Sequence, residues 1–141
     1  ARSKILGELA EAASTPDQRE QWLRQQIDSI ATATHANAFP NGLKELQTVE
    51  TSIVRESKDS PLAPFVRYRR IVAEYAQRLA ADDAKDQAAA QEWYTEQLEG
   101  FARAYPKSED TPEALLQLAS NLELHGKLKE ARKWYQPLDT N

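Results

Sequence analysis

Apolar residues recur along the chain every three or four positions, the spacing that places them on one face of an α-helix. Six such stripes can be followed between residues 23 and 138. Each stripe predicts a helix whose buried face it forms. In chain order the stripes are Leu23, Ile27, Ile30 and Thr34; Leu43, Leu46, Val49 and Ile53; Phe65, Tyr68, Val72, Tyr75 and Leu79; Tyr94, Leu98, Phe101 and Tyr105; Leu115, Leu118, Ala119 and Leu122; and Leu128, Ala131, Tyr135 and Leu138.

Prolines mark where the helices begin and end. Thr15-Pro16, Ser60-Pro61 and Thr111-Pro112 each place a hydroxyl residue before a proline. A Ser or Thr at the N-cap accepts a hydrogen bond from an exposed amide, and proline suits the first helical position, so each pair predicts a helix start. The residue before a proline is pushed out of helical geometry, so two further triplets predict helix ends. These are Ala38-Phe39-Pro40 and Ala104-Tyr105-Pro106.

Together these signals predict about seven helices and no sheet. The predicted helices cover about 3–13, 16–35, 41–57, 61–80, 84–105, 112–125 and 127–138. Because the connections are short, sequential helices are expected to pack antiparallel. The predicted fold class is all-α: a single domain over residues 1–141 in which antiparallel helical hairpins stack as an irregular α-solenoid.

The composition narrows the classes of function. Lysine and arginine total 18 against 22 acidic residues, and this formal charge of −4 disfavours a nucleic-acid partner. No apolar run approaches the roughly 18 residues of a membrane-spanning helix, so we expect no membrane insertion. The chain contains no cysteine, so no thiolate can act as a nucleophile or metal ligand. It begins at Ala1 and stops shortly after a new helix has started, which we interpret as a piece of a longer protein.

Two short patterns recur at the spacing of helical hairpins. Residues 57–63 match residues 108–114 in the placement of hydroxyl, acidic, proline and alanine residues. The pair Trp93-Tyr94 returns as Trp134-Tyr135 after 41 residues. Self-similarity at this spacing is typical of stacked helical hairpins, in which each unit buries its apolar side on its neighbours.

The last thirty residues resemble a tetratricopeptide repeat. The resemblance implies that Gly126 turns the chain and that Ala131 packs under the first helix of the pair. Earlier units depart from the pattern, since Arg67 and Tyr68 stand where its Leu-Ala pair would fall. The small and large positions of the motif are met by Leu118, Ala119, Leu122, Gly126, Ala131 and Tyr135, with Glu130 before the alanine.

A second resemblance covers residues 105–135. Tyr105-Pro106-Lys107-Ser108, followed by Pro112-Glu113-Ala114-Leu115, looks like the repeat variant of bacterial cell-envelope proteins. The segment is also similar to the helical part preceding the thioredoxin-like domain in some bacterial thiol-disulfide oxidoreductases and peroxiredoxin relatives. This implies a bacterial envelope or periplasmic location and a fused redox domain beyond Asn141. Any enzymatic activity would then lie outside this segment.

Histidines and clustered carboxylates have structural explanations. His35 and His125 lie far apart without a matched carboxylate cluster, and a cation near a helix C-terminus is favourable in itself. Asp82, Asp83 and Asp86 stand at a predicted helix start, where negative charge is equally favourable. These residues therefore predict no metal site.

The arginines of residues 67–70 could bind an anion, but a solvated face explains them better. Arg67, Arg70, Glu74 and Arg78 share the face opposite the Phe65 stripe. No glycine-rich phosphate loop, nucleophile elbow or His-Glu metal motif occurs in the chain. We therefore predict no catalytic residue and no cofactor.

The helix predicted at 112–125 carries a second stripe, on a face away from its apolar one. In tetratricopeptide repeats the first helix of each pair lines the concave surface, so the resemblance implies that this stripe binds a partner. Two of its members, both leucines, are apolar where solvent is expected; they bind a partner, or they pack on the preceding hairpin or on a continuation of the chain. The stripe consists of Glu113, Leu116, Ser120, Glu123 and Leu124.

These observations predict a non-catalytic protein-interaction or scaffold module. Its expected partner is a protein, a peptide or an adjacent domain of the same chain. The alternative is a passive structural spacer or a dimerisation arm attached to a catalytic domain.

Overall fold

The computed structural model describes residues 15–35, 41–80, 84–124 and 126–139. These residues form helices and no β-strand, which confirms the all-α prediction, and every predicted boundary within them agrees to within one residue. The predicted helix at 3–13 and the predicted stop at Ala38-Phe39-Pro40 lie outside the described residues. The helices are α2 (Pro16–His35), α3 (Gly42–Glu56), α4 (Leu62–Leu79), α5 (Ala84–Ala104), α6 (Thr111–Leu124) and α7 (Leu128–Asp139).

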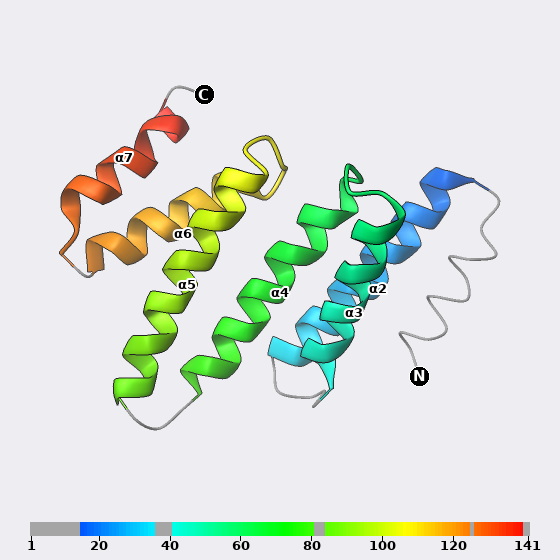
Figure 1. The fold of residues 1–141 in the computed structure, drawn as a ribbon, viewed down its shortest axis with the longest axis horizontal. Coiled ribbons are helices and arrows are strands. Elements are labelled where there is room, and N and C mark those ends of the chain that lie inside the picture. The colour runs from blue at the N-terminus through cyan, green and yellow to red at the C-terminus, as the bar shows by residue number, and fades with distance from the viewer. Residues whose placement is uncertain (1–14, 36–40, 81–83, 125, 140–141) are drawn as a thin grey trace. The chain divides into compact units, whose positions relative to one another are not determined.

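The chain divides into two compact units, Ala1–Glu74 and Tyr75–Asn141. The boundary lies inside α4, so the last residues of this helix belong to the second unit (Figure 1). Stacking of the hairpins into a solenoid, within one domain, stays a prediction.

Two of the three hydroxyl-proline pairs cap their helices as predicted. The Thr15 hydroxyl accepts a hydrogen bond from the Gln18 amide at 3.2 Å, with Pro16 at the first position of α2. The Ser60 hydroxyl accepts one from the Leu62 amide at 3.2 Å, at the start of α4. Both helix starts therefore follow from local side-chain chemistry.

The third pair acts differently, and the prediction that Thr111 is an N-cap was wrong. α6 already begins at Thr111, and the Ala114 amide donates to the carbonyl of Asp110. The Thr111 side chain is buried and donates its hydroxyl hydrogen to the carbonyl of Tyr105. Thr111 thus ties the start of α6 to the end of α5.

The first unit is built on the antiparallel pair of α2 and α3, which contact each other (Figure 1). Most residues of the predicted stripes lie in or against its core, including Leu23 and Val49, whereas Leu43 is only half-buried. The close approach of the helices depends on Gly42, whose missing Cβ leaves room for the Thr34 side chain. The core consists of Ile27, Ile30, Leu46, Ile53, Leu62, Ala63, Phe65, Val66 and Ala73.

α4 is buried over more of its circumference than its predicted stripe covers. Val66 and Ile71 are both fully buried, although five positions separate them by about 140° around the helix. Phe65 is buried as predicted, whereas Tyr68 and Val72 are only half-buried. A single stripe from Phe65 to Leu79 was therefore the wrong description of this helix.

Two arginines of α4, Arg69 and Arg70, form ion pairs, so Arg70 does not belong to the predicted solvated face. Arg70 Nε lies 2.5 Å from Glu50 Oε1 on α3, and Arg70 Nη1 lies 3.6 Å from Glu74 Oε1. These three side chains are only 16%, 20% and 14% exposed. Arg69 Nε lies 2.7 Å from Asp28 Oδ1, and its guanidinium stands over the Phe65 ring. The arginines therefore connect helices of the first unit.

The second unit contains α5, α6 and α7, with α6 in contact with both of the others (Figure 1). The predicted stripes of α5 and α6 are confirmed, since Leu98, Phe101 and Leu118 are fully buried. Ala131 is buried on α7. The side chains of Tyr135 and Leu138 lie outside the described part of the structure.

Asn121 is a buried polar residue that joins α6 to α5. Its Nδ2 donates to the carbonyl of Gln91 at 3.2 Å and to the hydroxyl of Thr95 at 2.6 Å. Thr95 in turn donates to the carbonyl of Gln91 at 3.0 Å. A satisfied network of this kind fixes how two helices pack, because any slip leaves a buried polar group unpaired.

α6 ends in a turn that requires glycine. Gly126 has φ +74°, its amide donates to the carbonyl of Glu123 at 3.0 Å, and the Lys127 amide donates to the carbonyl of Leu122 at 2.9 Å. These two hydrogen bonds define a Schellman motif. The expected turn at Gly126 is thereby confirmed.

Replacing Gly126 by valine is expected to lower the free energy of unfolding by more than about 1 kcal/mol, because a β-branched residue tolerates positive φ badly. A Cβ at this position meets no atom within 4 Å, so the cost is one of backbone conformation and not of a clash. Gly126→Asn is the matched control and should cost less, since asparagine adopts this conformation more readily. Urea denaturation midpoints measure both. Equal losses of stability for the two variants, or no loss for valine, would contradict the assigned positive-φ turn at Gly126.

Candidate functional site

The five predicted site residues lie together on α6. At 100° per residue they occupy one face, which we call the α6 face: Glu113, Leu116, Ser120, Glu123 and Leu124. Ser120 is half-buried and the other four are exposed. The α6 face thus lies opposite the buried stripe that includes Leu118 and Leu122.

Leu116 and Leu124 are the unusual members of the α6 face. Leu116 is 44% exposed and Leu124 is 82% exposed. Within the described ranges, Val54 on α3, at 41%, is the only other large apolar side chain that is exposed. Both leucines therefore present aliphatic surface at one side of α6, and Leu124 presents more of it than Leu116.

Glu113 begins the α6 face and lies near an aromatic pair. The Tyr75 and Tyr94 rings stack with centroids 3.8 Å apart and an interplanar angle of 7°. Burial, reinforced by Tyr75 and by the negative charge of Glu113, raises the pKa of Tyr94 to about 12. The Tyr94 hydroxyl therefore stays neutral near neutral pH. The Glu113 carboxylate accepts a hydrogen bond from Gln117 Nε2 at 3.0 Å.

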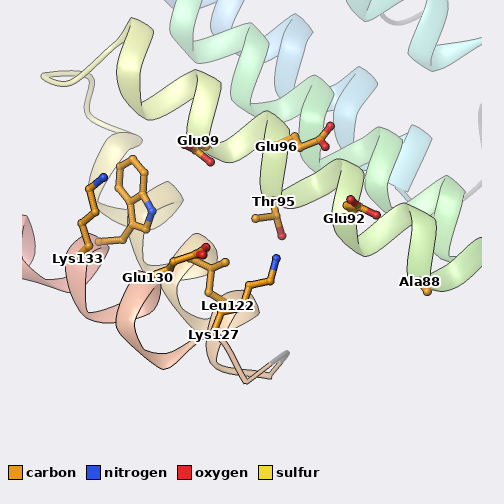
Figure 2. A pocket seen from close by; sticks show the side chains of 10 residues that line it. Ala88, Glu92, Thr95, Glu96, Glu99, Leu122, Lys127, Glu130 and Lys133 are labelled. Carbon is orange, nitrogen blue, oxygen red and sulfur yellow. The ribbon is translucent and has the colours of Figure 1, made fainter.

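A groove of about 680 Å³ lies between α5 and α7 in the same unit (Figure 2). Sequence reasoning did not identify it, although the spacing of Glu92, Glu96 and Glu99 places all three on one face of α5. Its opposite wall depends on where α7 packs, which is a tertiary feature. We call this the α5–α7 groove; it is lined by Ala88, Glu92, Thr95, Glu96, Glu99, Leu122, Lys127, Glu130, Lys133 and Trp134.

The first unit has a smaller cavity of about 390 Å³ between α2 and α4. Its floor is apolar, with Ala31, Val72 and Ala73, and the Asp28–Arg69 ion pair stands at its edge. Opposite charges are already paired there. This cavity therefore offers a small apolar contact, and the Asp28 and Arg69 charges beside it already pair with each other.

Two of the candidate metal residues, His35 and Asp86, lie in the described ranges. His35 is exposed in the last turn of α2, and Asp86 is exposed in the first turn of α5, where a negative charge favours the helix dipole. His125, Asp82 and Asp83 lie outside the described residues. Within the described part of the chain, no group of three or more His, Asp or Glu residues is arranged to hold a metal ion.

None of the helices described here combines the length and hydrophobicity that crossing a membrane requires. Comparisons of the chain with protein-family models, with curated proteins and with solved structures find no match. The likeness to tetratricopeptide repeats thus stays a prediction.

Proposed function

We propose that the chain is a non-catalytic protein-interaction module that binds a segment of a partner protein on the α6 face. The observation that carries this proposal is the exposure of Leu116 and Leu124 on one side of a helix whose other side is core. Exposing aliphatic surface to water is unfavourable, so two exposed leucines on one side of a helix favour a surface that a partner covers.

The α6 face also indicates the chemistry of the partner. Leu116 and Leu124 are eight positions apart, or about 12 Å along the helix axis. A partner helix would match them with apolar residues seven or eight positions apart, and an extended segment with apolar residues about four positions apart. Glu113 and Glu123 flank the leucines and would favour lysine, arginine or amide side chains beside those anchors.

Membership of the tetratricopeptide-like class, a bacterial cell-envelope location and attachment to a thioredoxin-like domain belong to the same proposal. They rest on the sequence resemblance of residues 105–135. In that arrangement this chain supplies binding, and any redox activity belongs to the attached domain. The competing function is a passive spacer or dimerisation arm.

Selection from a random twelve-residue peptide library tests the proposal. The wild-type chain is immobilised, and the Leu116→Ser/Leu124→Ser variant is used for counter-selection. We expect enriched peptides to carry two apolar residues beside lysine or arginine, and to bind the double variant at least about tenfold more weakly, as loss of two anchor residues implies.

Val54→Ser is the matched control, because Val54 is a comparably exposed apolar residue on α3. This variant should bind the selected peptides like the wild type. Failure to enrich any peptide, or enrichment that survives the double substitution, would favour the spacer.

A further inference from the structure

The α5–α7 groove has walls of opposite charge. The α5 wall carries Glu92, Glu96 and Glu99. The other wall carries Lys127 and Lys133 with Glu130 between them, a net charge of +1 from two lysines and one glutamate. Figure 2 shows the Lys127 amino group directed towards α5. Trp134 adds apolar surface to the same groove, and the buried Leu122 lies beneath it.

The α5 wall carries like charges at the spacing of one helical turn. Glu20–Arg24 on α2 and Glu99–Arg103 on α5 itself are mixed pairs four positions apart. Glu92 and Glu96 are instead like charges four positions apart, an arrangement that destabilises an isolated helix slightly.

The two walls do not neutralise each other across the groove. In the described part of the chain, Glu92, Glu96, Lys127 and Lys133 are exposed and form no ion pair. Lys133 lies over the Trp134 ring at 5.9 Å. Separate rows of unpaired negative and positive charge are therefore available to whatever enters the groove.

The groove has the size of a peptide segment. Its α5 wall runs from Ala88 to Glu99, about 16 Å along the helix, which is the length of about five residues of extended chain. Successive side chains of an extended chain point to opposite sides. An occupant that alternates basic and acidic residues would therefore direct its cations to α5 and its anions to Lys127 and Lys133.

We propose that the α5–α7 groove is a docking site for an extended segment of a partner protein in which lysine or arginine alternates with aspartate or glutamate. The site is separate from the α6 face, because Leu122 in the groove and Ser120 on the α6 face lie on opposite sides of α6. The two sites can be occupied together.

The test uses an acetylated eight-residue peptide of alternating lysine and glutamate. A peptide with the same composition in two blocks, four lysines and then four glutamates, is the matched control, and spermine is the control for charge alone. Binding is followed by amide chemical shifts in NMR spectra of the full chain. The alternating peptide should bind at least about fivefold more tightly than the block peptide, with shifts concentrated at Glu92, Glu96 and the Trp134 indole.

Charge substitutions sharpen the test, since all four target side chains are exposed. Glu92→Lys/Glu96→Lys should abolish the preference for the alternating peptide. Adding Lys127→Glu/Lys133→Glu to that variant exchanges the charges of the two walls and should restore the preference. The alternating peptide can then bind after sliding by one residue, because this exchanges the sides to which its lysines and glutamates point. Leu116→Ser/Leu124→Ser should leave it unchanged, which separates this site from the α6 face.

Three results would overturn the proposal. These are equal binding of the block peptide or spermine, shifts centred on Leu116 and Leu124, and absence of binding by a chain whose helical circular dichroism is intact.

Discussion

Replacing Gly42 by alanine is expected to destabilise the first unit by about 3 kcal/mol, the upper end of the usual cost of overpacking. A Cβ on Gly42 would lie 1.7 Å from Thr34 Oγ1, closer than non-bonded atoms can approach, and 3.0 Å from Thr34 Cβ, which is a tight contact. Thr34 cannot easily move away, because it is fully buried and its hydroxyl donates to the carbonyl of Ile30 at 2.7 Å. Urea denaturation measures the loss.

A double-mutant cycle identifies the clash as the cause. In a Thr34→Ala background the offending Oγ1 is absent, so Gly42→Ala should cost at least about 1 kcal/mol less than in the wild type. Thr34→Val keeps a branched side chain in the same place and should not relieve the cost. Additive effects of Gly42→Ala and Thr34→Ala would show that the two helices approach each other differently.

The second large effect is expected for Asn121→Asp, which should cost about 2–4 kcal/mol at pH 7. The substitution keeps the shape of the side chain but replaces an N–H donor by a carboxylate oxygen. That oxygen would face two acceptors, the carbonyl of Gln91 and the hydroxyl of Thr95. Gln117→Glu, an amide-to-acid change at a less buried position of α6, is the control and should cost under about 0.5 kcal/mol.

The pH dependence of the stability of the Asn121→Asp variant gives a second readout. Burial and the facing oxygens would raise the pKa of the new carboxyl in the folded state above its value in the unfolded chain. A carboxyl whose pKa is raised by folding stabilises the folded state at low pH. This contribution is lost as the pH rises through the folded-state pKa. The deficit relative to wild type should therefore shrink as the pH falls towards about 4. A deficit that does not change with pH would contradict the assigned hydrogen bonds.

The helix positions could be predicted from the sequence because the signals that set them are local. Thr15 and Ser60 cap the helices that follow them, and Gly126 supplies the positive φ that closes α6. None of these depends on residues distant in the sequence. The helical periodicity of the apolar residues also predicted the buried faces of α2, α5 and α6, because this signal too is local.

The misjudged residues are those whose environment comes from other helices. Arg70 was assigned to a solvated face, but its partner Glu50 lies on α3, twenty residues away. Thr111 resembled an N-cap, but its hydroxyl has the carbonyl of Tyr105 as acceptor. Spacing along one helix cannot show which faces a neighbour will cover.

The two candidate sites also differ in how far local sequence signals predict them. The α6 face could be predicted because all five residues belong to one helix and the helical wheel groups them. The α5–α7 groove could be predicted only in its α5 half, since the positions of Lys127 and Lys133 relative to α5 depend on how α7 packs. Sequence patterns therefore predict surfaces of single helices better than grooves between helices.

The thermal midpoint of the Leu116→Ser/Leu124→Ser variant tests most directly the claim that the α6 face is a free binding surface. The two leucines are 44% and 82% exposed, so the account predicts a midpoint within a few degrees of the wild type. If both belonged to a core, truncation would cost about 2–5 kcal/mol each, and a unit of this size would lose well over about 10 °C. A drop of that size would contradict the proposed binding face and favour the spacer.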